Sequence, residues 1–167
     1  MKPIYLEMNY FGPHENSVVD FRLLDESPIF LISGDTGAGK STIFDAMTYA
    51  LFGTTTGDRD AKEMRSQFAT ADDRTSVTFY FKQGNLLYRI ERSPEQKLSK
   101  KRGSGSTLQK STAKLAIVDR VKGIEKNNIA INPKNVGEEI TRLLHLNAEQ
   151  FKKIILLPQN DFSRFLK

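Results

Sequence analysis

Hydrophobic and polar positions alternate along parts of this chain and recur with helical spacing along others. The first alternating stretches, residues 4–11 and 17–21, flank a Gly12-Pro13 pair that is typical of a turn. We therefore expect the chain to begin with two antiparallel strands. A short apolar run at residues 29–33 follows and predicts a third strand, which is buried.

Two further stretches, residues 76–81 and 85–92, alternate so that each places its apolar side chains on one face. The link between them contains Gly84-Asn85, which suits a hairpin turn. Residues 112–120 predict another strand. The segment before it, residues 93–111, is basic and rich in glycine and serine, so we expect a mobile loop there.

Three stretches have helical character. The first, residues 40–52, is followed by Gly53, a residue that commonly ends helices. A second helix is predicted over residues 136–146, after a segment at 125–135 that we expect to be a loop. A third begins near Asn147, whose side chain suits an N-cap. The apolar side of the first helix is expected to consist of Ile43, Phe44, Met47 and Leu51.

A glycine-rich segment lies between the predicted strand at 29–33 and the first helix. It matches the P-loop pattern of glycine, four residues, glycine, lysine, then serine or threonine. The matching residues are Gly34, Asp35, Thr36, Gly37, Ala38, Gly39, Lys40 and Ser41, with Thr42 next in the chain. Glycines let successive backbone N–H groups converge on phosphate oxygens, and the helix that follows directs the positive end of its dipole to the same place.

The side chains at the end of this segment complete the predicted phosphate site. Lys40 places a full positive charge near the terminal phosphates, and the Ser41 hydroxyl can bind a magnesium ion. The pattern therefore predicts that residues 34–42 bind a nucleoside triphosphate together with a magnesium ion. The glycines, the lysine and the hydroxyl each have a separate chemical role that requires this spacing.

Composition narrows the class of protein. A length of 167 residues suits one domain, and the absence of cysteine excludes disulfides and thiolate metal sites. No apolar run approaches the roughly 20 residues that a bilayer-spanning helix needs, and the N-terminus lacks a signal peptide. We therefore expect a cytoplasmic protein that does not bind membranes. The net charge of +5 favours a polyanionic partner.

Two features resemble a particular class of P-loop protein. Two strands before the P-loop strand are typical of the ABC-type ATPase heads of DNA-repair and chromosome-maintenance proteins. The segment LNAEQFKKIILLPQNDFSRFL, residues 146–166, closely resembles the Q-loop region of the SbcC family, the ATPase subunits of bacterial SbcCD nucleases. The segments YRIERSPEQ and KKRGSGSTLQKSTAKL also resemble that family, so the resemblance covers nearly the whole chain.

The resemblance implies an α/β fold: a P-loop NTPase half-head of the ABC-ATPase type, with a mixed sheet flanked by helices and an antiparallel β layer. Residues 1–167 would form the N-terminal half of the head. In this family the Walker B strand, the signature motif and the switch histidine lie in a C-terminal half, beyond a long coiled coil. Glu138-Glu139 do not follow an apolar strand, and His14 and His145 lie at unsuitable positions for the switch. We therefore expect a fragment that holds half an active site.

The same resemblance implies site residues and partners. Gln159 would be the Q-loop glutamine, which binds magnesium and positions the attacking water, and it would share the catalytic role with Lys40. Asn160 stands where the family usually has glycine. Catalysis would require a second copy of the head facing the first, with ATP between them. The whole protein would use ATP binding and hydrolysis to control an SbcD-type nuclease on double-stranded DNA ends and hairpins.

A cluster of cations in the segment 93–111 is a candidate contact for DNA phosphates. It consists of Lys97, Lys100, Lys101 and Arg102. Lysine and arginine on a loop can neutralise phosphates along a duplex. The same four residues equally fit a solvated charge run between two strands.

Two alternatives to the main interpretation remain open at the level of sequence. One is the head of a nucleotide-gated DNA clamp without a nuclease, as in SMC or RecF proteins, which the Q-loop segment disfavours. The other is a complete small NTPase or kinase. That alternative would require an acidic Walker B strand within this chain, and we find none.

Overall fold

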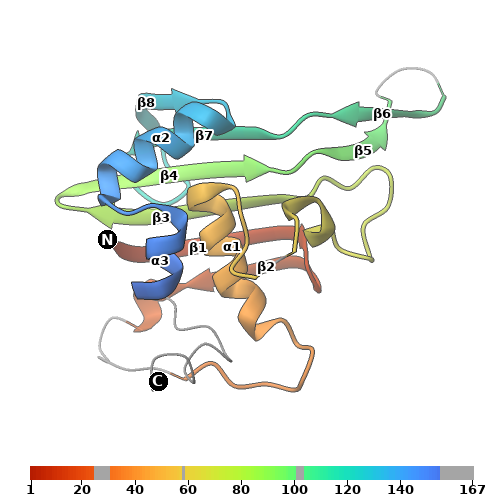
Figure 1. Ribbon diagram of the computed structural model, residues 1–167, viewed down its shortest axis with the longest axis horizontal. Coiled ribbons are helices and arrows are strands. Elements are labelled where there is room, and N and C mark those ends of the chain that lie inside the picture. The colour runs from red at the N-terminus through yellow and green to blue at the C-terminus, as the bar shows by residue number, and fades with distance from the viewer. Residues whose placement is uncertain (25–30, 58, 101–103, 155–167) are drawn as a thin grey trace.

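The computed structural model describes residues 1–24, 31–57, 59–100 and 104–154, and its main element is a six-stranded sheet (Figure 1). The strand order is β2-β1-β3-β4-β7-β8, and every pairing in it is antiparallel. The strands are β1 (Lys2–Phe11), β2 (His14–Asp20), β3 (Ser76–Gln83), β4 (Leu86–Ser93), β7 (Thr112–Val118) and β8 (Glu125–Ile131).

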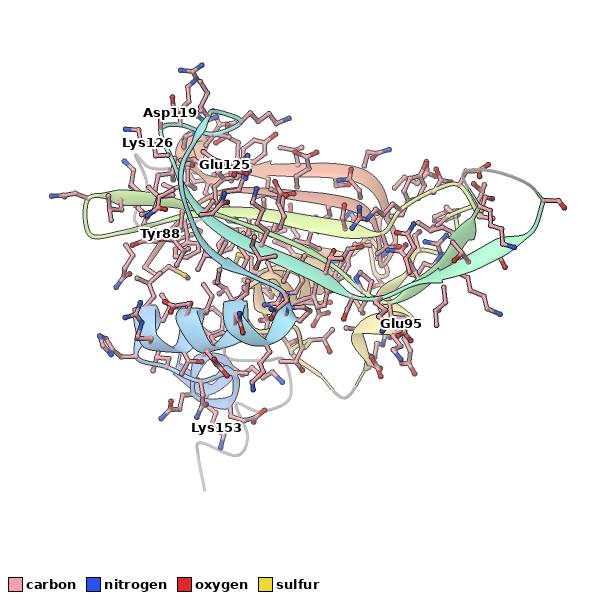
Figure 2. All side chains as sticks on the ribbon, turned by 90° about the horizontal axis from the view of Figure 1, so that it is seen from above. Tyr88, Glu95, Asp119, Glu125, Lys126 and Lys153 are labelled. Atoms are coloured by element: carbon pink, nitrogen blue, oxygen red, sulfur yellow. The ribbon has the colours of Figure 1, made fainter. Side chains whose placement is uncertain are left out.

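Three α-helices lie on one side of this sheet, and Figure 2 shows Lys153 on α3 pointing away from it. They are α1 (Lys40–Phe52), α2 (Pro133–Leu144) and α3 (Ala148–Ile154), with two 3-10 helices, η1 (Phe21–Leu24) and η2 (Ala61–Met64). Helices packed on a sheet confirm the predicted α/β class. The central helix, α1, carries Lys40 at its first position, so packing of α1 on the sheet also positions the glycine-rich segment.

The core lies between the sheet and these helices. Fully buried side chains such as Leu6 of β1 and Ile90 of β4 face α1 from the sheet. Each such burial contributes about 1.5–3 kcal/mol of transfer free energy. Aromatic rings join the layers: Phe11 stacks on Tyr49 at 5.6 Å, and Phe52 meets Phe151 of α3 at 5.3 Å between ring centroids.

Several local predictions are confirmed. The strands β1 and β2 pair across the Gly12-Pro13 turn, and β3 and β4 form a hairpin closed by Gly84-Asn85. Gly53 ends α1 in a left-handed conformation, φ 78°, and its N–H donates to the Tyr49 carbonyl at 2.8 Å. The Asn147 side chain accepts from the Gln150 N–H at 2.9 Å, which is the expected cap of α3. Each of these turns and caps is formed by residues that lie close together in the sequence.

The expected loop at 125–135 is wrong, because residues 125–131 form the edge strand β8. Its partner β7 supplies the pairing, and Leu115 lies opposite Ala130. Three consecutive polar residues of β8, Lys126, Asn127 and Asn128, are exposed, so the sequence of this strand shows no regular alternation of apolar and polar residues. Helix α2 then begins at Pro133, three residues earlier than expected, because Asn132 caps it by accepting from the Asn135 N–H at 3.0 Å.

The described parts of the basic segment, residues 93–100 and 104–111, are also more ordered than expected. They form the hairpin of β5 (Gln96–Ser99) and β6 (Ser106–Gln109), which extends beyond one end of the six-stranded sheet (Figure 1). Alternate residues of β5, Gln96 and Leu98, are buried, whereas Lys97 is exposed. The glycine- and serine-rich composition suggested too little burial to stabilise a strand. Burial of one side of β5 provides that stabilisation.

Two expectations of burial near the glycine-rich segment are wrong. Residues 31–33 form no strand, and the Leu31 side chain is 88% exposed, while residues 29 and 30 lie outside the described part. A strand needs a hydrogen-bonded neighbour, and the described sheet pairs no strand with residues 31–33. Phe44 of α1 is 39% exposed, because it lies away from the side of α1 that packs on the sheet.

A carboxylate between two cations links three strands at the β8 edge. Glu125 of β8 accepts from Lys114 of β7 at 2.5 and 2.7 Å and pairs with Arg89 of β4. Figure 2 shows Glu125 close to Asp119 and Lys126 in this part of the molecule. The hydrogen bond from Lys114, with the charge of Arg89, lowers the pKa of the Glu125 carboxyl.

This lowered pKa predicts how stability depends on pH. The ion pairs stabilise the fold above the unfolded-state pKa of the carboxyl, and that stability is lost as pH falls through the lower, folded-state pKa. We expect Glu125→Gln to lower the free energy of unfolding by about 1 kcal/mol at neutral pH, with the difference vanishing in acid. Urea denaturation across pH measures this difference. The control is Glu138→Gln, because the Glu138 side chain on α2 is 66% exposed. An equal loss of unfolding free energy in Glu125→Gln at pH 7 and at pH 2 would contradict this prediction.

Candidate functional site

The glycine-rich segment forms an exposed loop at the N-terminus of α1. Its residues from Gly34 to Ala38 are all solvent-exposed, and Gly37 has no heavy atom within 4 Å of where a Cβ would stand. Gly37 and Gly39 have φ angles of 86° and 82°, which other residues adopt only with strain. The loop therefore leaves its backbone open to a ligand from solvent.

The first turn of α1 has the properties of an anion site. Gly39 occupies the N-cap position and has no side chain to cap the helix, and no acidic residue lies in the first turn. The N–H groups of a first helical turn have no partner within the helix. Together with the positive end of the helix dipole, these free donors suit phosphate oxygens.

Lys40 lies across the mouth of this loop. Its Nζ donates to the Gly34 carbonyl at 2.8 Å and to the Asp35 carbonyl at 2.6 Å. These bonds hold the loop in a curve around the ammonium group. A lysine ammonium has three N–H donors, so one remains for a phosphate oxygen.

The two hydroxyls after Lys40 have different surroundings. Ser41 is exposed and free to turn toward a ligand, whereas Thr42 is 7% exposed and faces the turn between β1 and β2. A Cβ on Gly12 would lie 2.6 Å from the Thr42 Cγ2 atom, so the Thr42 side chain packs directly against that turn. The described residues contain no group of three or more carboxylates or imidazoles that would hold a metal. Among the described residues at this loop, the Ser41 hydroxyl is a candidate ligand for a magnesium ion, and waters and the nucleotide's own phosphates would fill further positions.

The turn between β1 and β2 packs directly against the loop. The Gly12 N–H donates to the Met64 carbonyl at 2.7 Å, which connects this turn to η2. His14 at the start of β2 lies 3.2 Å from the Gly39 carbonyl through Nε2. Sequence reasoning missed His14 as part of this site, because 25 residues separate it from Gly39 and no local pattern links them.

The remaining predicted site residues fall into two groups. Gln159, Lys101 and Arg102 lie outside the described residues. Lys97 and Lys100 are exposed on the β5–β6 hairpin, and the Lys100 N–H donates to the Gly105 carbonyl at 3.0 Å. The structure thus brings Lys40 and the loop residues together, and it presents both described cations of the hairpin to solvent.

No helix in the described ranges is long and apolar enough to cross a membrane. The α/β architecture and the phosphate loop agree with comparisons to known proteins. The family described as AAA domain matches residues 5–167 of this chain. The SbcC subunit of nuclease SbcCD from Vibrio cholerae serotype O1 is 39% identical to it over 99% of this chain.

Two further relatives carry the same name. The proteins from Staphylococcus aureus strains MRSA252 and JH9 are 42% and 41% identical, again over 99% of this chain. The chain spans 16% of the length of each of these relatives. The predicted resemblance to the SbcC family is confirmed over almost the whole chain, and the chain belongs to the AAA domain family, whose match begins before the phosphate loop and continues to residue 167.

Proposed function

We propose that residues 34–42 bind ATP with Mg2+ and that this chain is the N-terminal ATP-binding part of an SbcC-like ATPase head. The observation that carries the proposal is the combination of an uncapped α1 N-terminus with Lys40 across an exposed glycine loop. Each feature by itself occurs in many proteins. Together they provide converging donors and one full positive charge at a single place.

Different residues of this site would bind the phosphates, neutralise their charge and hold the magnesium ion. Backbone N–H groups of the loop and of α1 would orient the phosphates, and Lys40 would neutralise charge on the terminal ones. The Ser41 hydroxyl and the Gln159 amide oxygen would hold the magnesium ion, which when bound shields the phosphate oxygens. Gln159 would also orient the attacking water. Removing water from this open loop requires a surface that covers it, and a second head in the whole protein would supply that surface.

The whole protein would couple this site to DNA processing. The names of the relatives support a complex with an SbcD-type nuclease, and that complex would act on double-stranded DNA ends and hairpins. A cytoplasmic location agrees with the absence of cysteine from this sequence. The nucleotide-gated clamp without a nuclease is less well supported, because the relatives named above are nuclease subunits.

Binding of ATP by the chain itself tests the proposal. Titration of the purified chain with ATP, followed by calorimetry with and without Mg2+, should give saturable binding that magnesium strengthens. Absence of binding at millimolar ATP would count against the phosphate loop assignment. Turnover by the chain alone at the rate of an intact ATPase would favour the small-NTPase alternative, because a general base contributes about 10²–10⁴-fold and none is identified here.

The basic hairpin gives a separate prediction about DNA. Replacing Lys97, Lys100, Lys101 and Arg102 with serine should weaken duplex binding by the full-length protein equally for all sequences, because phosphate contacts carry no base information. The slope of log affinity against log salt should become shallower by about 0.9 for each phosphate that the variant no longer neutralises. Salt titrations of a fluorescent duplex measure both effects.

The matched control removes four cations elsewhere: Lys62, Lys134, Arg142 and Lys153, all exposed, become serine. This control has the same net charge as the hairpin variant, so it separates a local contact from a general loss of charge. An unchanged slope and affinity in the hairpin variant would show that the hairpin cations are only solvated charges.

A further inference from the structure

His14 is placed between the β1–β2 turn and the phosphate loop, with both ring nitrogens within hydrogen-bonding distance of a partner. Nε2 lies 3.2 Å from the Gly39 carbonyl oxygen, and Nδ1 lies 3.0 Å from the Ser17 hydroxyl. The ring is packed so closely that a Cβ on Gly39 would lie 2.5 Å from Nε2 and 2.6 Å from the Pro13 Cγ atom. The imidazole is therefore held against the peptide that begins α1.

The partners of the ring determine its protonation pattern. A carbonyl oxygen only accepts hydrogen bonds, so the proton of a neutral ring must lie on Nε2 for the bond to Gly39 to form. Nδ1 then has a lone pair, and the Ser17 hydroxyl can donate to it. The Ser17 hydroxyl is compatible with this tautomer and, by donating to Nδ1, holds the ring in its orientation toward Gly39.

This bond acts on the N–H of Lys40 through the geometry of the peptide unit. The Gly39 carbonyl and the Lys40 N–H belong to one planar trans peptide, so they point in opposite directions. An anchor on the oxygen consequently fixes the direction of the N–H. Lys40 is the first residue of α1, and its N–H is one of the donors without an intrahelical partner.

Gly39 makes such an anchor useful. Its φ of 82° belongs to the left-handed region, and glycine samples other regions at little cost. As the N-cap residue, Gly39 also offers its carbonyl to the first intrahelical bond of α1, so the bond from His14 is a second restraint on the peptide between Gly39 and Lys40. This second bond keeps the Lys40 N–H directed at the phosphate site when the first turn of α1 opens. A restraint that exists before the ligand arrives lowers the ordering cost of binding.

We propose that His14 is a positioning residue for phosphate binding: its Nε2–H holds the Gly39 carbonyl so that the Lys40 N–H faces the phosphates. This inference rests on the proposed function of the loop as an ATP site. It assigns a role to the β1–β2 turn, which otherwise lies outside the glycine-rich segment. It also explains why a residue at position 39 must leave room for an imidazole ring.

Three variants of the chain test the assignment. His14→Phe keeps a ring of similar size but removes the donor, and His14→Gln restores an N–H donor at a similar reach. Affinities for Mg-ATP, Mg-ADP and adenosine are measured by calorimetry, and thermal unfolding confirms that each variant is folded. We expect His14→Phe to weaken ATP and ADP binding by about 3–10-fold, the range for one neutral hydrogen bond, and to leave adenosine binding unchanged. His14→Gln should recover the affinity to within about 2-fold, and Ser17→Ala should give a smaller loss than His14→Phe.

A second readout, made without nucleotide, separates this inference from the proposed function. In ¹⁵N-labelled protein, the backbone amide signal of Lys40 should shift in His14→Phe and return toward the wild-type position in His14→Gln. If wild-type protein bound no ATP, the proposed function would fail, while the Lys40 signal would still test the anchor. Wild-type-like ATP affinity in His14→Phe, or a loss in His14→Gln equal to that in His14→Phe, would overturn the role of His14.

Discussion

Lys40→Ala is expected to reduce ATP hydrolysis by the full-length protein at least about 100-fold, because removing one donor that stabilises developing charge costs about 10²–10³ in kcat. The structure adds a second reason for a large effect. The Lys40 ammonium also bridges the Gly34 and Asp35 carbonyls, so its loss removes both the charge and the bonds that curve the loop. Steady-state phosphate release and ATP binding by calorimetry measure the two consequences.

A matched variant makes this result specific. Lys134→Ala removes the same charge from α2, where the side chain is 84% exposed and pairs with Glu138 only at 4.0 Å. We expect Lys134→Ala to retain hydrolysis and binding within about 2-fold, as is usual for exposed charges. Near-normal nucleotide affinity in Lys40→Ala would contradict the assignment of the loop.

Arg92→Ala is expected to lower the free energy of unfolding by about 2–5 kcal/mol. Arg92 of β4 is 4% exposed; its Nε donates to the Ala50 carbonyl at 3.0 Å and its Nη2 to the Leu51 carbonyl at 3.2 Å. Burial lowers the pKa of the guanidinium to about 10, so it remains charged at neutral pH and binds the negative end of the α1 dipole. Alanine would leave a cavity and two carbonyls at the end of α1 without their charged donor.

Urea denaturation at neutral pH measures this loss, and Arg74→Ala is the matched control. Arg74 also bonds two hydroxyls, of Ser93 and Thr112, but it is exposed, so its removal should cost below about 1 kcal/mol. If the two variants lost comparable free energies of unfolding, burial would not explain the contribution of Arg92 to stability. The Arg92 contact also bears on the proposed function, because it holds the C-terminal end of the helix whose N-terminal end is the proposed phosphate site.

The sequence by itself determined the features that depend on near neighbours. Gly53 predicted the end of α1, and Asn147 predicted the start of α3. These two predictions succeeded because a cap is specified by residues a few positions apart, whose bonds form within the segment itself. The spacing from Gly34 to Ser41 predicted a phosphate loop, and the structure places that segment at the N-terminus of α1. Resemblance in residues 146–166 added the family, which the comparisons confirmed.

Only the tertiary structure decided which distant segments meet. β8 became a strand because β7 lies beside it, and residues 31–33 did not become part of a strand because the described sheet offers them no neighbour. The contact of His14 with Gly39 and that of Arg92 with the end of α1 join residues 25 and more than 40 positions apart. A hydrogen bond across such a separation depends on how the sheet and α1 pack, and single-sequence periodicity carries no information about that packing.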